Sequence, residues 1–336
     1  MNTIGNLRLR PMHYYILLSA SMEQIIGAAL STLVGIMLPM IQLLTQPELS
    51  TFVQGLIGAA GLIGIGLGSA VIGAVIDRQG YLLWFRLCPL IIMAGAAMVY
   101  FRPSLLTLGI GFFISGIGVG GGYSLDSAYI SELMPAGRRS FMVGVAKGLC
   151  AVGFIGAAVI CYFILRSDPS PAIWPKLAII IAAMGLITLL LRIYWVESPE
   201  WLMQQGRTAE AQKAAARMFG PGVTANPLPA KEMTLPFSDL FKGENLKRVI
   251  FSGIPWACEG VGVYGIGVFL PVLVMALGLQ SATEYGMPKI ISSVEITAFV
   301  NFFILPGFVL GLWLARRHNH VKLLAWGFIL CAIGLA

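Results

Sequence analysis

Apolar runs long enough to cross a lipid bilayer dominate this sequence. From Phe52 to Ile76, about 25 residues pass without one charged side chain, and at ~1.5 Å per residue such a helix spans a hydrocarbon core of roughly 30 Å. Across the chain, 57% of residues are hydrophobic and 11% are charged, against about 25% charged in soluble domains. Most of the surface therefore cannot face water, and we expect an all-α polytopic membrane protein.

Each long apolar run predicts one membrane span. The predicted spans are Tyr14 to Met40, Phe52 to Ile76, Leu82 to Phe101, Leu105 to Ile130, Phe141 to Leu165, Trp174 to Trp195, Val249 to Leu277 and Ile290 to Leu314. A last run, from Lys322 to Ala336, is too short to cross a bilayer. We therefore expect a chain truncated after the start of a ninth helix.

The basic residues are unevenly distributed between the two sides of these spans. The formal net charge is +7. If the N-terminus is cytoplasmic, the only Lys and Arg on the outer side are Arg102, Arg166, Lys176 and Lys289. This is the positive-inside pattern. It predicts a multi-pass protein of the plasma membrane (bacterial inner membrane) with a cytoplasmic N-terminus, and it accounts for the charge without a nucleic-acid partner.

An acidic residue lies deep inside the first predicted span. Glu23, followed by Gln24, lies about ten residues from the start of the span, hence ~15 Å deep. A carboxylate at this depth costs several kcal/mol unless it faces water or a partner, or is protonated. A functional role is therefore the first interpretation. A protonated Glu23 that links two helices structurally is the alternative.

Features of the first half recur in the second half at nearly the same spacing. Glu259 lies inside the seventh span as Glu23 does in the first, and Gly311 to Arg316 repeats Gly73 to Arg78 without the acid. This pattern indicates duplicated helical bundles in the same orientation. The predicted units are a six-helix bundle over 1–196, a cytoplasmic linker with short helices over 197–248, and a partial second bundle over 249–336.

A buried ion pair is predicted between the fourth and fifth spans. Asp126 lies about nine residues before Pro135, and Lys147 lies about ten residues after Gly137 on the next, antiparallel helix. The two residues thus lie at similar depth, and a charge inside the membrane is tolerated when it is paired. The sequence leaves open whether the pair is a fixed link or a proton-responsive switch.

Three short motifs resemble the major facilitator superfamily of secondary transporters. The segment Gly73 to Gly80 reads G-A-V-I-D-R-Q-G, and Val196 to Leu202 reads V-E-S-P-E-W-L, similar to the P-E-S-P-R-W-L element of sugar porters. The end of the fourth span resembles the sugar-porter branch and its organic-ion and aromatic-acid relatives. The matching residues there are Tyr129, Glu132, Pro135 and Arg138. The resemblance implies two pseudo-symmetric helical bundles, of which the second is incomplete here.

The same resemblance implies alternating access, in which two bundles rock about a midplane site. It also implies a cytoplasmic gate of charged residues around the loop motifs. The gate residues carried onto this sequence are Asp77, Arg78, Glu132, Arg138, Arg139 and Arg316.

The expected function is secondary transport of a small polar organic metabolite by proton-coupled uptake. We expect a central site that binds the substrate and a proton, formed by Glu23, Gln24, Trp256, Glu259 and Tyr264. An uncoupled facilitator and a non-transporting, receptor-like or defective membrane protein remain alternatives. No nucleophile, base and orienting residue converge as in an enzyme. We also expect no cofactor, no metal site and a monomeric state.

Overall fold

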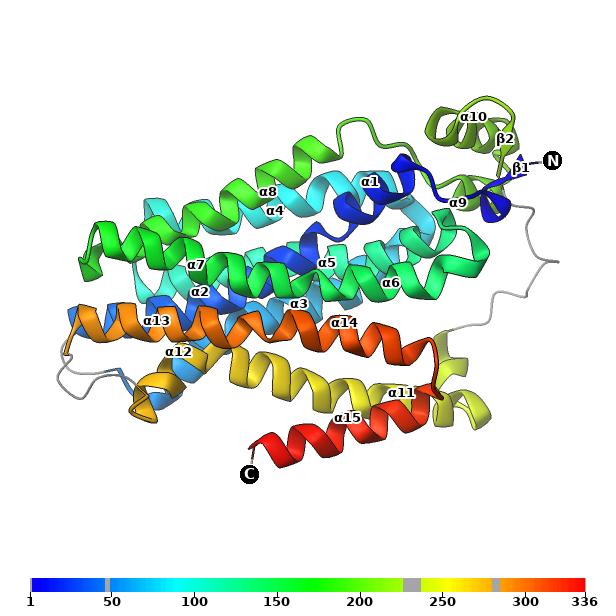
Figure 1. Ribbon diagram of the computed structural model, residues 1–336. Helices are drawn as coiled ribbons and strands as arrows, with labels where there is room; N and C mark the ends of the chain where they lie inside the picture. The colour runs from blue at the N-terminus through cyan, green and yellow to red at the C-terminus, as the bar shows by residue number, and fades with distance from the viewer. Residues whose placement is uncertain (1, 46–48, 226–236, 280–284, 336) are drawn as a thin grey trace.

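The computed structural model of the protein describes residues 2–45, 49–225, 237–279 and 285–335. Nearly all of these residues are helical, and one short parallel strand pair joins Asn2–Thr3 (β1) to Val223–Thr224 (β2). Within the described ranges, 8 helical segments are long and apolar enough to cross a membrane (Figure 1). The predicted all-α polytopic architecture is confirmed.

The first six spans form one bundle. Their helices are α1 (Pro11–Ala20) and α2 (Met22–Leu44), α3 (Thr51–Gln79), α4 (Tyr81–Phe101), α5 (Leu105–Leu133), η2 (Ala136–Arg138) with α6 (Arg139–Gly148) and α7 (Cys150–Ser167), and η3 (Pro171–Leu177) with α8 (Ala178–Leu191). The sixth helix ends four residues before the predicted boundary at Trp195. Arg192 therefore lies just beyond the last helical turn.

The remaining helices form the linker and the second bundle. They are α9 (Pro199–Gln204) and α10 (Thr208–Phe219), η4 (Phe237–Phe241), α11 (Gly243–Gly260), the π-helix η5 (Val261–Ile266), α12 (Gly267–Ala276), α13 (Met287–Phe302), α14 (Ile304–Ala315) and α15 (His320–Leu335). Since α11 begins at Gly243, the helix of the seventh span starts inside the range predicted as linker. Ser198 accepts a hydrogen bond from the Trp201 amide at 3.2 Å and caps α9, with Pro199 at its first position.

Glycine allows α3 and α5 to pack with their backbones in contact. A Cβ at Gly68 would collide with the Ile117 backbone, and a Cβ at Gly120 would collide with the backbone at Ile65 and Ser69. Small residues spaced along one helix face permit this close approach. The second span is thus packed directly against the fourth.

The N-terminus and the linker helices lie at the same end of the bundle, which we call the linker end (Figure 1). Strand β1 pairs with β2, and the Arg10 guanidinium donates a hydrogen bond of 2.5 Å to the Phe219 carbonyl. Ile4, Trp201 and Phe219 are buried in one apolar cluster with span residues such as Ile72 and Phe85. Helices α9 and α10 are therefore folded onto the first bundle.

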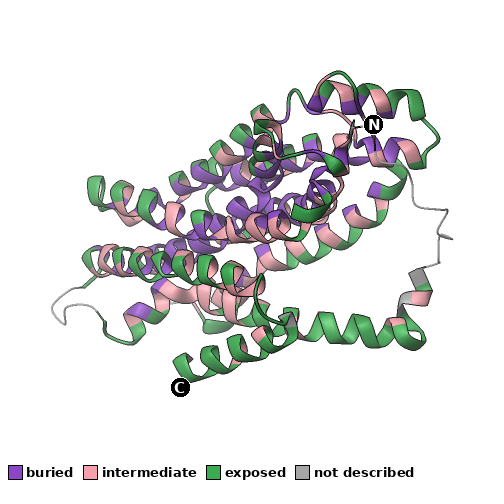
Figure 2. Cartoon of the chain, turned by 45° about the vertical axis from the view of Figure 1, so that its right-hand side comes forward, coloured by how far each residue is buried: buried purple, intermediate pink, exposed green. Residues whose placement is uncertain are grey.

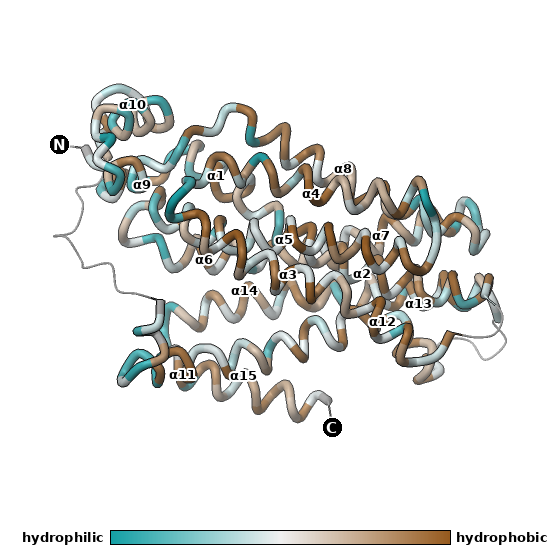
Figure 3. Tube along the Cα trace, turned by 180° about the vertical axis from the view of Figure 1, so that it is seen from behind, coloured by the Kyte–Doolittle hydropathy of each residue, from teal (hydrophilic) through white to brown (hydrophobic). Residues whose placement is uncertain are grey.

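The first span is the centre of the molecule, and the second bundle is much more exposed. Every residue of α2 from Met22 to Ile41 is buried, whereas α11 and α14 contain no buried residue (Figure 2). Hydrophobic residues follow the spans and polar residues gather at their ends (Figure 3).

The two bundles approach most closely at the end opposite the linker end. A Cβ at Gly35 on α2 would collide with the Val268 carbonyl on α12, and α13 packs along α7. At the linker end, α14 of the second bundle contacts α6 of the first, where the Arg316 guanidinium lies 3.7 Å from the centre of the Phe141 ring.

Candidate functional site

Glu23 forms an ion pair with Arg192, and both side chains are fully buried. The guanidinium makes two hydrogen bonds to the carboxylate, one of 2.5 Å to Oε1 and one to Oε2. Such a bidentate pair is the strongest geometry for Arg and a carboxylate. The expectation that Glu23 is a lone carboxyl facing a central cavity is therefore wrong, because sequence reasoning overlooked Arg192. The signal was present, since Arg192 was a charged residue inside the predicted sixth span.

Arg192 also joins three spans through backbone carbonyls. It donates to the Ser19 carbonyl at 2.8 Å and to the Phe85 carbonyl at 3.1 Å. Its guanidinium lies 4.6 Å from the Phe85 ring centre and 5.4 Å from that of Trp195. Ser19 lies immediately before the break between α1 and α2. Arg192 thus holds the break in the first span against α4 and the end of α8.

Next to this pair, Asp126 collects polar partners from three spans. The Gln24 amide donates to Asp126 Oδ2 at 2.8 Å, and the Ser127 amide donates to Oδ1 at 2.6 Å. Lys147 Nζ lies 3.8 Å from Oδ1, so the expected pair is present at a long distance. Asp126 is buried, whereas 29% of the Lys147 side chain is exposed. Lys147 is therefore the accessible member of the pair.

Tyrosine hydroxyls from the two bundles meet beside Lys147. The Tyr123 and Tyr264 oxygens are 3.3 Å apart, and Lys147 Nζ lies 5.3 Å from the Tyr123 ring centre. Tyr264 lies in η5, a π-helical turn inside the seventh span. Such turns occur frequently at functional sites. We call Gln24, Tyr123, Asp126, Lys147 and Tyr264 the central cluster.

The other two predicted site residues lie on α11, away from these hydrogen bonds. Trp256 is 67% exposed, and Glu259 is exposed as well. Among the described residues, Glu259 makes neither a hydrogen bond nor an ion pair. Of the five predicted site residues, the structure therefore brings Gln24 and Tyr264 to the central cluster. Glu23 is paired with Arg192, and Trp256 and Glu259 are exposed on α11.

The six predicted gate residues do not form a charge latch in this conformation. No ion pair joins any two of them in the described part of the chain. Glu132 accepts hydrogen bonds from the Tyr81 hydroxyl at 2.7 Å and from the Ser198 hydroxyl. Arg139 donates to the Met134 carbonyl at 3.2 Å. Asp77, Arg78 and Arg138 are exposed. Arg316 is exposed as well and lies over the Phe141 ring.

Glu197, in the sugar-porter-like element, caps the N-terminus of α4. Its carboxylate accepts from the amides of Tyr81 at 2.8 Å and Leu82 at 3.2 Å. The preceding Gly80 has φ of +83°, and a Cβ there would lie 2.5 Å from Glu197 Oε2. An anion at a helix N-terminus satisfies free amides and the helix dipole. The loop motif that ends at Gly80 and the sugar-porter-like element are thus in direct contact.

The fold and the central cluster define a helical membrane protein with polar groups held between two bundles. A family model described as "Sugar (and other) transporter" matches residues 19–336. The chain therefore belongs to the sugar (and other) transporter family, within the major facilitator superfamily that its motifs resemble.

Two curated relatives are similar over most of this chain. The inner membrane metabolite transport protein YgcS of Escherichia coli (strain K12) is 29% identical over 88% of this chain and 63% of YgcS. The niacin transporter NiaP of Acinetobacter baylyi is 26% identical over 99% of this chain and 74% of NiaP. The chain thus spans about two thirds to three quarters of the length of these relatives.

A solved structure with the same fold is the xylose transporter XylE from E. coli in a partially occluded inward-open conformation. The TM-score is 0.69 at 18% identity, with 91% of this chain and 74% of XylE covered. At this identity the likeness shows the fold alone, which is the major facilitator fold. The relatives and this neighbour are transporters, which supports the expectation that the chain is not an enzyme.

Proposed function

We propose that the chain is a secondary carrier that moves a small polar organic metabolite across the bacterial inner membrane by alternating access. The observation that carries the proposal is the contact between Tyr123 and Tyr264, 3.3 Å apart. It places polar groups of both bundles against each other inside the membrane-spanning region. When the two bundles rock, polar groups at the interface between them can change hydrogen-bond partners, as alternating access requires.

The central cluster offers chemistry suited to a small polar ligand. Lys147 supplies a partly exposed ammonium, and the two tyrosines supply hydroxyl groups and ring faces. The Gln24 amide holds Asp126, so the acid is fixed while Lys147 stays accessible. A few convergent polar groups among apolar walls are typical of small-molecule sites.

Orientation and coupling complete the proposal. The linker end carries most of the basic residues and faces the cytoplasm by the positive-inside rule. The bundles are packed together at the opposite end, which corresponds to a state open toward the cytoplasm. Glu259 lies inside the seventh span next to the π-helical turn that carries Tyr264, and it makes no hydrogen bond or ion pair among the described residues. We therefore assign it the coupling proton. Its protonation would remove the cost of an unpaired charge inside the membrane.

Uptake into proteoliposomes with and without an inward proton gradient tests this proposal. A panel of radiolabelled small polar metabolites, with sugars and carboxylates included, is supplied outside vesicles that contain the full chain. Uptake that the gradient accelerates supports symport. Equal uptake with and without the gradient would instead support an uncoupled facilitator. Binding without uptake would support a receptor-like protein and overturn transport.

A further inference from the structure

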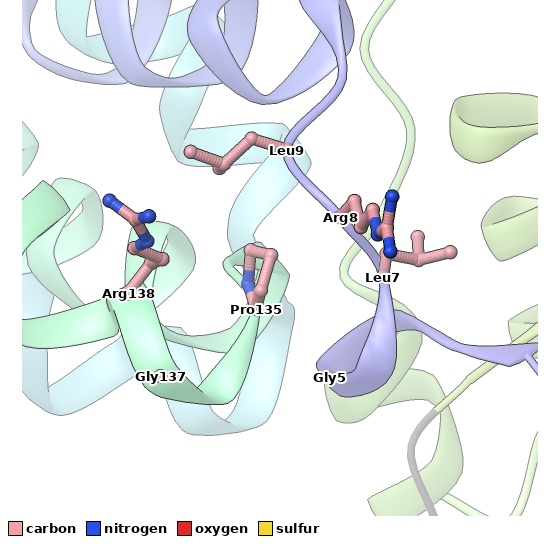
Figure 4. Close-up of a pocket in the computed structure, with 7 residues that line it drawn as sticks. All are labelled: Gly5, Leu7, Arg8, Leu9, Pro135, Gly137 and Arg138. Atoms are coloured by element: carbon pink, nitrogen blue, oxygen red, sulfur yellow. The ribbon is translucent and has the colours of Figure 1, made fainter.

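A pocket lies at the linker end, away from the central cluster. It has a volume of about 470 Å³ and lies between the N-terminal segment and the loop that joins the fourth and fifth spans. Its walls include Leu7, Arg8 and Leu9 from the segment and Pro135 and Arg138 from the loop. Figure 4 shows Arg138 and Arg8 on either side of Pro135, with the Leu9 side chain above Pro135 in this view.

The two arginines of this pocket carry unneutralised charge. Both side chains are exposed, and in the described ranges neither guanidinium makes a hydrogen bond or an ion pair. The described residues that line the pocket include no acid. Guanidinium groups recognise phosphate oxygens by paired hydrogen bonds. The pocket therefore presents two guanidinium groups that no described residue neutralises.

Both walls are held in place by the fold. On one side, Ile4 and Leu7 are 1% and 8% exposed, and β1 fixes the start of the segment on β2. On the other side, Pro135 is buried and its carbonyl accepts from the Arg138 amide at 2.8 Å. Arg8 and Arg138 thus line one pocket from distant parts of the sequence, each on an ordered wall. Less conformational entropy is lost when such a site binds its ligand.

The position and the apolar lining of the pocket indicate an amphiphilic anion. It lies where the first span begins and the fourth span ends, which is the level of the lipid headgroups. Leu9 and Pro135 offer apolar surface beside the two guanidinium groups. We propose that this pocket binds the phosphate headgroup of an anionic phospholipid, with its glycerol and upper acyl carbons against Leu9 and Pro135.

Binding of short-chain lipids to the purified full chain in detergent tests the proposal. Dihexanoyl phosphatidylglycerol is titrated against the wild-type chain and against the variant Arg8→Gln/Arg138→Gln, with dihexanoyl phosphatidylcholine and inorganic phosphate as further probes. The control variant is Arg86→Gln/Lys213→Gln, which removes two exposed basic residues on the same end of the bundle. Thermal unfolding of each variant identifies any loss of folding.

We expect phosphatidylglycerol to bind the wild-type chain and the control variant alike. The pocket variant should bind it more weakly by about fivefold for each arginine removed, because each basic group near an anionic headgroup contributes ~1 kcal/mol. Phosphatidylcholine should bind the wild-type chain no more tightly than it binds the pocket variant. Equal affinity in the pocket variant and the control would overturn the proposal. Binding of inorganic phosphate without binding of phosphatidylglycerol would overturn the lipid assignment.

Discussion

Glu23 and Arg192 neutralise each other at the centre of the first bundle, with neither side chain exposed. The pair joins the break in the first span to the end of the sixth. A buried pair of this kind is sensitive to the loss of one partner, because the other charge is left without compensation. This relationship gives Glu23 a structural role in the present conformation and moves the candidate ligand site to the neighbouring central cluster.

The first prediction concerns this ion pair. Glu23→Gln should lower the free energy of unfolding by ~3 to 5 kcal/mol, because the Arg192 charge stays buried and unpaired. Arg192→Met should lower the free energy of unfolding by a similar amount, because the Glu23 charge then stays buried and unpaired. Thermal unfolding in detergent, followed by size-exclusion chromatography of heated samples, measures both losses.

The double variant Glu23→Met/Arg192→Met supplies the control for that prediction. Replacing both charges by apolar side chains of similar length leaves no unpaired charge, so the double variant should lose less stability than either single variant. Losses that simply add would show that the two side chains act independently, contrary to the observed geometry.

The sequence predicted the spans well because the length of an apolar run is a strong constraint. The depths of Asp126 and Lys147 followed from counting residues on antiparallel helices, and the structure brings the two within 3.8 Å. The partner of Glu23 was missed although Arg192 lay inside the predicted sixth span, because the charge of Arg192 was not weighed against that of Glu23. The helix ends at Leu191, which frees the Arg192 side chain to turn inward.

The relative placement of the two bundles could not be predicted from the sequence. The contact of Tyr123 with Tyr264 joins residues far apart in the chain, and no local pattern encodes it. The gate residues were carried over by resemblance, which gives no information about the conformation in which they pair. Glu132, for example, accepts hydrogen bonds from hydroxyl groups here and not from a basic residue.

The second prediction tests the close packing of α3 and α5. Gly68→Ala should lower the free energy of unfolding by ~1 to 3 kcal/mol, because the added methyl group collides with the Ile117 backbone. Gly66→Ala, on the same helix, has nothing within 4 Å of the added carbon and should leave stability unchanged or slightly raised. Thermal unfolding of the two variants makes the comparison. Equal effects at Gly66 and Gly68 would contradict the packing.

The third prediction concerns the cap of α4. Glu197→Ala should lower stability by ~0.5 to 2 kcal/mol, because the amides of Tyr81 and Leu82 lose their acceptor. Glu200→Ala is the matched control, since its carboxylate makes no hydrogen bond or ion pair in the described ranges. Hydrogen exchange of the first turn of α4, measured by mass spectrometry, should increase in the Glu197 variant alone. An unchanged rate there would rule out the cap.

The fourth prediction concerns the coupling proton. In Glu259→Gln, acceleration of uptake by an inward proton gradient should disappear, while exchange of substrate across the membrane continues at equal pH. The cause is that the glutamine amide cannot take up or release a proton within the transport cycle. Glu244→Gln, an exposed acid on the same helix, should retain the gradient effect. Gradient-driven uptake that persists in the Glu259 variant would assign coupling to another group.

Substrate exchange by a central-cluster variant tests the account most directly. Lys147→Met removes the accessible cation but keeps the length of the side chain. Lys176→Met is the control, because it removes an exposed basic residue at the end of the bundle opposite the linker end. Both are compared with the wild-type chain in proteoliposomes at equal insertion. The account predicts that the Lys147 variant exchanges substrate about tenfold or more slowly, the loss expected when a charged hydrogen bond of ~1.5 to 3 kcal/mol is removed, and that the control matches the wild type. Equal exchange by all three would contradict a substrate site at the central cluster.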